Sequence, residues 1–104
     1  MQTEYIVVLL ACPKAEAGEL TEAIVSAGLA ACVQRTEMIS TYVWKGEQVT
    51  EPEARLMLKT KSVLFGRIEA LVREKVSYET PQIIALPVQQ ANRDYLDWID
   101  EVTV

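Results

Sequence analysis

The sequence predicts an α+β fold in a single domain that covers residues 1–104. Segments with strand and helix character follow one another as strand, helix, two strands, helix, strand and a final helix. The two middle strands form one long hairpin, and the first and last strands are apolar on both faces, as strands inside a sheet are. This is the order of the ferredoxin-like split βαβ fold, with an extra C-terminal helix.

Local signals mark the first strand and the first helix. Residues 3–11 are apolar on both faces, which predicts a central strand. Pro13 then opens a helix, where its missing N–H removes no hydrogen bond, and Gly28 ends that helix. Between them, apolar residues recur at helical spacing: Ala17, Leu20, Ala23, Ile24 and Ala27.

Residues 31–61 form the predicted hairpin. Its first arm is rich in β-branched and aromatic residues, and Lys45, Gly46 and Glu47 form the turn, because Gly46 can adopt the positive φ of a tight reversal. Pro52 in the return arm cannot donate to a ladder of hydrogen bonds. We therefore expect a bulge or a break in pairing near Pro52.

The length of this hairpin predicts self-association. Each arm spans about 46 Å, whereas the first strand reaches only about 30 Å, so the tip extends past the sheet. An isolated two-stranded ribbon is marginally stable, and we therefore expect Tyr42 and Trp44 at the tip to rest on another copy of the chain. The apolar second face of the sheet needs cover for the same reason.

The second half of the chain predicts a helix, a strand and a last helix. Ser62 is the expected N-cap of a helix whose apolar face is Leu64, Ile68, Leu71, Val72 and Val76. Residues 77–82 form a loop, and residues 83–88 form a short buried strand that leaves the sheet at Pro87. Asn92 caps the final helix, whose apolar residues are Tyr95, Leu96, Trp98, Ile99 and Val102.

Composition and charge exclude several classes of function. The net charge is −5 and the ten Lys and Arg residues are scattered, which argues against nucleic acid as a partner. The longest apolar run, residues 5–12, is too short to span a bilayer, and no basic segment precedes it, so we expect a cytoplasmic protein without a membrane partner. Because the chain contains no His, it has no Ser-His-Asp or Cys-His nucleophile. We therefore expect that the protein is not an enzyme.

The two cysteines are expected to be free thiols, as is usual in the cytoplasm; the alternative is a disulfide in a secreted domain. If Cys12 ends one strand and Cys32 begins the strand parallel to it, with the return arm of the hairpin between them, they lie at opposite ends of the sheet. One chain alone would then be unable to pair them.

Five motifs in order resemble the CutA family, the divalent cation tolerance proteins, over nearly the whole chain. They are Leu29-Ala30-Ala31-Cys32-Val33, Ser40-x-Tyr42-x-Trp44-x-Gly46, Glu53 to Lys59-Thr60, Tyr78-Glu79-x-Pro81 and Tyr95-Leu96-x-Trp98-Ile99. The resemblance implies a ferredoxin-like domain assembled as a homotrimer whose hairpins reach across to neighbouring subunits. It also implies a response to copper and other divalent metal ions. The chain departs from the family where Val76 replaces the usual His and Gln82 a Glu, which weakens any site that uses those side chains.

Cys32 is the candidate metal ligand, because a thiolate suits Cu(I) and the family motif carries Cys at this position. Copper is thus the candidate metal, and no cofactor is otherwise indicated. Packing is the alternative, since free Cys is often a small buried hydrophobic residue. Met38 and Met57 are read as core residues rather than ligands. Glu51 and Glu53 share a face of their strand and are either cation ligands or partners of basic residues.

Trp44, Glu53, Lys59 and Tyr78 form a candidate ligand cleft at the subunit interface. Matched to the family pattern, they fall where subunits meet, and a cation, a carboxylate, a phenol and an indole suit a small anionic ligand. The alternative is a polar rim that sets the register of the trimer. Two functions follow: a trimer that binds metal ions without turnover, and a PII-like ligand-sensing or scaffold trimer that holds a small anionic metabolite.

Overall fold

The computed structural model describes residues 4–104 and contains every predicted element, with ends that shift by one or two residues. The elements are β1 (Tyr5–Cys12), α1 (Lys14–Ser26), β2 (Cys32–Trp44), β3 (Glu47–Lys61), a 3₁₀ turn (Ser62–Leu64), α2 (Phe65–Lys75), β4 (Gln82–Pro87) and α3 (Arg93–Val102). The start of the first predicted strand, Thr3, lies outside the described residues. No helix in this part of the chain is long and apolar enough to cross a membrane.

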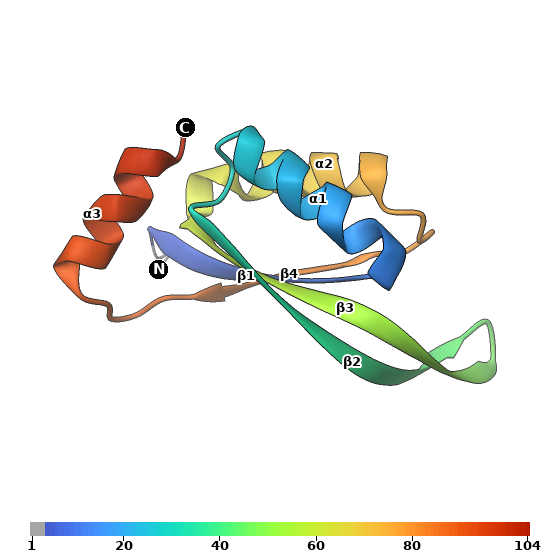
Figure 1. The fold of residues 1–104 in the computed structure, drawn as a ribbon. Helices are drawn as coiled ribbons and strands as arrows, with labels where there is room; N and C mark the ends of the chain where they lie inside the picture. The colour runs from blue at the N-terminus through green and yellow to red at the C-terminus, as the bar shows by residue number, and fades with distance from the viewer. Residues whose placement is uncertain (1–3) are drawn as a thin grey trace.

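The strands form one antiparallel sheet in the order β2-β3-β1-β4. Helices α1 and α2 lie side by side on one face of this sheet, and α3 lies beyond its end, near the N-terminus (Figure 1). This is the predicted α+β arrangement, with β1 and β3 at the centre and an additional C-terminal helix.

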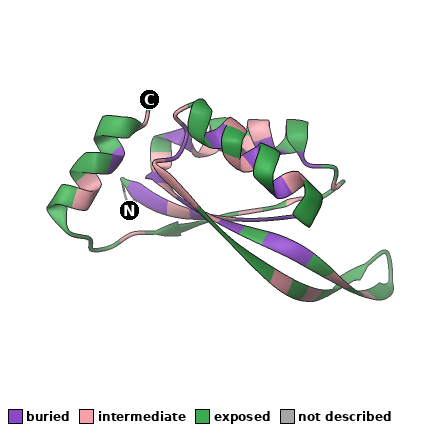
Figure 2. Ribbon diagram, viewed as in Figure 1, coloured by how far each residue is buried: buried purple, intermediate pink, exposed green. Residues whose placement is uncertain are grey.

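The core lies between the sheet and helices α1 and α2. Alternate residues of the two central strands point to the helices, because successive side chains of a strand face opposite sides. The side chains with the least exposure are Val8, Leu10, Leu20, Ile24, Leu56, Leu58, Ile68 and Val72. Figure 2 shows this buried layer in β1 and β3, whereas the hairpin tip and α3 are mostly exposed.

Of the two predicted N-caps, Asn92 is right in position and Ser62 is not. Asn92 occupies the N-cap position of α3, yet its side chain bonds to the carboxylate of Asp94 at 2.7 Å instead of to a backbone N–H. Ser62 begins the 3₁₀ turn, and Leu64 takes the N-cap position of α2. The expectation that Ser62 caps α2 was wrong, because the chain leaves β3 through one tighter turn before the helix begins.

The hairpin pairs without interruption from Cys32 opposite Lys59 to Trp44 opposite Glu47, so the bulge expected at Pro52 is absent. The N–H of Ser62 donates to the carbonyl of Glu4 at 2.9 Å. Because backbone groups of a strand alternate between its two sides, the even-numbered residues of β3 face β1.

The nitrogen of Pro52 therefore faces the side of β1, but β1 has already ended at Cys12, opposite Ala54. A proline there removes no ladder bond. The prediction was wrong because it did not consider which side of β3 the nitrogen of Pro52 faces.

The tip of the hairpin extends past the sheet, as its length predicted. Ile39 and Val43 are 71% and 73% exposed, on the face of the ribbon that turns away from the cavity described below. Tyr42 and Trp44 face the other way and line that cavity with Tyr78 of the same chain. Tyr42 and Trp44 thus have a partner within their own chain, but they keep 37% and 38% of their surface exposed, so contact with another copy of the chain stays a prediction. Ile39 and Val43 are the most exposed apolar residues of the tip.

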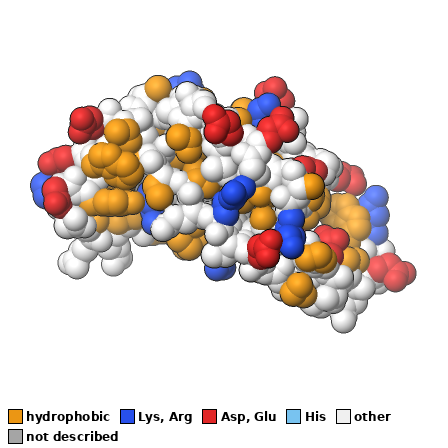
Figure 3. Space-filling model, viewed as in Figure 1, with side chains coloured by type: hydrophobic (Ala, Val, Ile, Leu, Met, Phe, Trp, Pro, Cys, Tyr) orange, Lys and Arg blue, Asp and Glu red, His pale blue; other side chains and the backbone are white. Residues whose placement is uncertain are grey.

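The face of the sheet opposite α1 and α2 is only partly covered, and we call it the open face. Ile84 and Leu86 of β4 lie on it, in register with Leu9 and Val7 of β1, and both are 46% exposed. The last strand was predicted to be buried; within one chain it is instead a half-exposed edge strand. Figure 3 shows hydrophobic side chains that reach the surface near α3 and near the hairpin.

Candidate functional site

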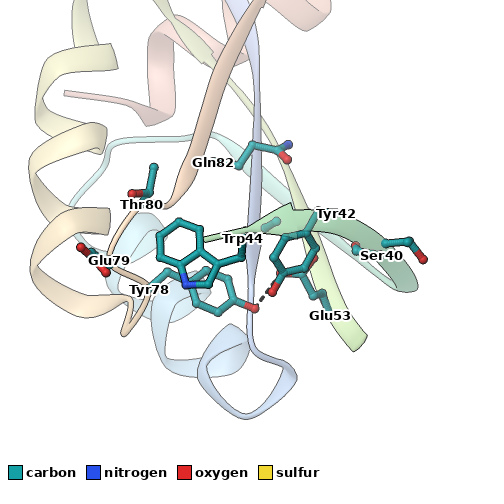
Figure 4. A pocket seen from close by; sticks show the side chains of 10 residues that line it. Ser40, Tyr42, Trp44, Glu53, Tyr78, Glu79, Thr80 and Gln82 are labelled. Carbon is teal, nitrogen blue, oxygen red and sulfur yellow. Dashed lines mark hydrogen bonds between the residues drawn. The ribbon is translucent and has the colours of Figure 1, made fainter. Parts of the chain in front are cut away.

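A cavity of about 480 Å³ lies between the far part of the hairpin and the loop that precedes β4. Figure 4 shows its side chains, which come from both arms of the hairpin, the end of β1 and the loop. The lining residues are Ala11, Ser40, Thr41, Tyr42, Trp44, Glu53, Tyr78, Glu79, Thr80 and Gln82. Volumes of this size are typical of sites for small molecules.

The buried carboxylate of Glu53 is the central polar group of this cavity. Glu53 lies on β3 opposite Met38, just before the point where β1 joins the sheet, and only 6% of its surface is exposed. The hydroxyl of Tyr78 donates to its Oε2 at 2.6 Å (Figure 4). A buried carboxylate needs such a partner, so the loop that carries Tyr78 is tied to the hairpin.

Both tyrosines of the cavity remain neutral phenols. Burial first, and then the hydrogen bond to Glu53, raise the pKa of Tyr78 far above its ordinary value. Tyr42 donates to Oε1 of Glu51, and this hydrogen bond raises the pKa of Tyr42 to about 12. Each phenol thus donates its proton in a hydrogen bond to a glutamate.

We predict that Tyr78→Phe flattens the alkaline loss of stability. The pKa of Tyr78 is raised above the ordinary value of 10.0, so its contribution is complete below pH 10 and is lost as the pH rises through the folded pKa. Wild-type unfolding free energy should therefore fall more steeply above pH 10, by up to about 1.4 kcal/mol per pH unit. Urea titrations of both proteins between neutral and alkaline pH measure the slopes, and identical slopes would contradict the assignment.

An ammonium group of the chain already lies at the rim of the cavity. The Nζ of Lys45 is 5.5 Å from the centre of the Trp44 ring and 3.5 Å from Oε2 of Glu79. Lys45 lies in the hairpin turn, where it has a positive φ. The rim thus combines an aromatic face with a carboxylate, the pair of groups that attracts an organic cation.

The structure brings together three of the four residues predicted for the cleft. Trp44, Glu53 and Tyr78 line the same cavity, but Lys59 does not. Lys59 lies six residues beyond Glu53 on β3, about 20 Å along the strand. Its Nζ donates to Oε1 of Gln34 at 2.8 Å, and it lines a smaller cavity beside α3.

Sequence reasoning did not assign Tyr42 and Glu79 to this cleft. Tyr42 was predicted to contact another subunit, and Glu79 was noted only as part of a motif. The spacing of Tyr42 and Trp44, two residues apart in one strand, was the available signal, because it places both side chains on the same face.

The predicted metal ligand Cys32 is half-buried at the start of β2, on the open face and opposite Lys59. Within residues 4–104, no three His, Cys, Asp or Glu side chains gather in a way that could hold a metal ion. Glu51 and Glu53 share a face of β3 as expected, but each accepts a hydrogen bond from a different tyrosine. Val76, where the resemblance expected His, is buried in the core.

Both cysteines are free, as predicted. Cys12 is fully buried at the end of β1, opposite Ala54, whereas Cys32 pairs with Lys59, five residues further along β3. Burial raises the pKa of the Cys12 thiol to about 11. Cys12 is therefore a protonated core residue at neutral pH.

Comparison with known sequences points to one group of proteins. A family model described as CutA1 divalent ion tolerance protein matches residues 6–102. The divalent-cation tolerance protein CutA of Thermus thermophilus is 39% identical over 99 residues, which cover 93% of this chain and 96% of that protein. Protein CutA of Mus musculus is 42% identical over 94 residues, covering 88% of this chain and 53% of the relative, so the chain spans about half the length of the mouse protein.

Solved structures give the same result. The divalent cation tolerance protein of Thermus thermophilus matches with a TM-score of 0.92 at 37% identity, over 96% of this chain and 99% of that one. The periplasmic divalent cation tolerance protein CutA of Archaeoglobus fulgidus matches with a TM-score of 0.92 at 30% identity, over 94% of this chain and 97% of that one. Sequence and fold therefore indicate the same relatives.

Proposed function

This chain belongs to the CutA1 divalent ion tolerance family, and on that premise we propose that it is a cytoplasmic homotrimer that binds metal ions, copper among them, and supports tolerance of them without turnover. The relative in Thermus thermophilus is named a divalent-cation tolerance protein, which supports the link to metal ions. The observation that carries the proposal is the difference between the two thiols: one is accessible and lies on the open face, and the other is sealed in the core.

The uncovered apolar surface supports assembly. Ile84 and Leu86 on the open face, and Ile39 and Val43 at the hairpin tip, leave large apolar side chains in water within one chain. Large apolar side chains that remain exposed in this way are typical of protein interfaces. A closed trimer covers such surfaces without leaving an open end for further growth.

Cys32 supplies the metal-binding group in this proposal. A half-buried thiol can be reached by a soft ion such as Cu(I), whereas the buried Cys12 thiol stays protonated. Because residues 4–104 contain no cluster of three ligands within one chain, a metal centre with several protein ligands has to draw on more than one copy. Metal binding is therefore linked to assembly.

We predict that Cys32→Ser abolishes Cu(I) binding, whereas Cys12→Ser largely retains it. The two substitutions are chemically identical and differ only in the accessibility of the thiol. Anaerobic calorimetry with Cu(I) on the two variants and the wild type measures the effect. Undiminished Cu(I) binding by Cys32→Ser would leave Cys32 as a packing residue and would remove the basis of the metal assignment.

Cu(II) and Zn(II) should bind weakly at neutral pH, because both favour imidazole and the chain has no His. Tight Zn(II) binding by the wild type would instead show that carboxylates of several subunits converge.

The proposed absence of turnover rests on the lack of His together with the tyrosines of the cavity, which are poor bases at neutral pH. The cytoplasmic location rests on the two unpaired thiols.

A ligand-sensing trimer is the second candidate, favoured by the cavity that Trp44, Glu53 and Tyr78 line together. The charge of that cavity does not suit the anionic metabolite that the sequence led us to expect, because Lys59 lies elsewhere.

A further inference from the structure

We propose that the cavity between the hairpin tip and the loop of residues 77–82 binds a small organic cation that carries primary ammonium groups. The inference rests on the second candidate function and is independent of copper binding at Cys32, which lies outside this cavity.

Three aromatic rings form the walls of the cavity. Tyr42 and Trp44 come from β2, and Tyr78 comes from the loop that faces them (Figure 4). The faces of such rings carry partial negative charge and attract cations, most strongly for tryptophan. The cavity of about 480 Å³ is large enough for a small aliphatic amine.

The charged residues of the lining are both acidic. They are Glu53, which is buried, and Glu79 at the rim, and among residues 4–104 no Lys or Arg lines the cavity. Arg55 lies two residues from Glu53 on the same face of β3, but it is exposed and outside the lining. An anion that entered would meet two carboxylates without a matching cation.

The hydrogen bonds of the two phenols leave their oxygens as acceptors in the cavity. Tyr78 donates its hydroxyl proton to Glu53, and Tyr42 donates its own to Glu51. Each phenol oxygen then keeps lone pairs but has no proton left to donate. An ammonium group, which has three donors and no acceptor, matches this set, whereas a carboxylate or phosphate does not.

The contacts of Lys45 show how an ammonium group can be bound at the rim of the cavity. Its ammonium group contacts the Trp44 ring and the carboxylate of Glu79, two lining groups. Lys45 is joined to the turn and reaches only the rim. A free amine can make the same contacts and extend inward to Glu53, in competition with Lys45.

The test compares three molecules with the same four-carbon chain and different charge: butane diamine, butanediol and succinate. Calorimetric titration of the native assembly should give the order diamine, then diol, then succinate, with the diamine at least about tenfold tighter than the diol, as expected when a desolvated cation meets an aromatic face and a carboxylate. Succinate as the tightest ligand would overturn the proposal and restore the anionic assignment.

Two substitutions with matched controls locate the binding. Trp44→Leu and Glu79→Gln should each weaken the diamine several-fold to about tenfold. Trp98→Leu removes a tryptophan of similar exposure from α3, and Glu37→Gln replaces a glutamate of similar exposure that pairs with Lys14. Both controls should bind the diamine as the wild type does. Equal losses in the controls would overturn the location.

Lys45→Met should increase the affinity for the diamine, because it removes the competing ammonium and leaves the Trp44 ring and Glu79 free. A gain cannot arise from misfolding, so this variant separates recognition from stability. No saturable diamine binding by either the wild type or Lys45→Met, in protein that is folded and assembled, would overturn the proposal. Cys32→Ser should not change diamine binding, which keeps this test separate from that of copper.

Discussion

Replacing Ile84 and Leu86 together by Lys is expected to convert the proposed trimer into single chains. Both side chains lie on the open face of β4, in register with Leu9 and Val7, and are half-exposed in the protomer. The protomer therefore tolerates two lysines there. A subunit interface does not, because two unpaired ammonium groups would be desolvated within an apolar contact.

Native mass spectrometry and sedimentation at micromolar concentration measure this effect. The matched control is the double variant Val25→Lys and Val63→Lys, which adds the same charge at exposed apolar residues of α1 and of the turn before α2. The control should keep the mass of the wild type. An unchanged mass for the β4 variant would show that the open face is not an interface, and a monomeric wild type would remove the trimer proposal altogether.

Ile24→Ala is expected to lower the free energy of unfolding by about 2 to 5 kcal/mol. Ile24 is fully buried in α1 and belongs to the core cluster that contains Leu10 and Leu56. The substitution removes three carbon atoms and leaves a cavity that the closely packed neighbours cannot fill. The better helix propensity of Ala returns only about 0.4 kcal/mol.

The neighbouring substitution Val25→Ala is the control, since both residues are β-branched, lie in the same helix and differ in burial, with Val25 46% exposed. We expect a change within about 0.5 kcal/mol for Val25→Ala. Urea unfolding at one fixed protomer concentration is required, because assembly of the proposed trimer would make stability depend on concentration. A similar cost for the two variants would show that Ile24 does not pack as the structure indicates.

The order of elements was predictable because the signals for it are local. The apolar run of β1, the helical spacing of Ala17, Leu20 and Ile24, and the reversal at Gly46 each depend on a few neighbouring residues. The effect of Pro52 on strand pairing could not be predicted from neighbouring residues. Whether its missing N–H costs a hydrogen bond depends on where β1 ends, and β1 is forty residues away in the chain.

The candidate site shows the same division. Trp44, Glu53 and Tyr78 were grouped through a family resemblance, and the structure brings them into one cavity. Lys59 was grouped with them through the same resemblance, but it lies six residues beyond Glu53 on β3 and outside the cavity. Residues on one face of a strand separate by about 6.6 Å for every two positions, so a shared face does not imply a shared site.

Composition and short-range pattern were sufficient to predict the α+β class, the long hairpin, the free thiols and the lack of imidazole chemistry. The accessibility of each thiol, the set of exposed apolar residues and the charge of the cavity could be learned only from the tertiary structure. Cys12 and Cys32 are alike in sequence, but one lies beneath the helices and the other on the open face. The burial of Cys12 and the hydrogen bond between Tyr78 and Glu53 both depend on contacts between segments far apart in the chain. The packing of the sheet against its helices sets those contacts.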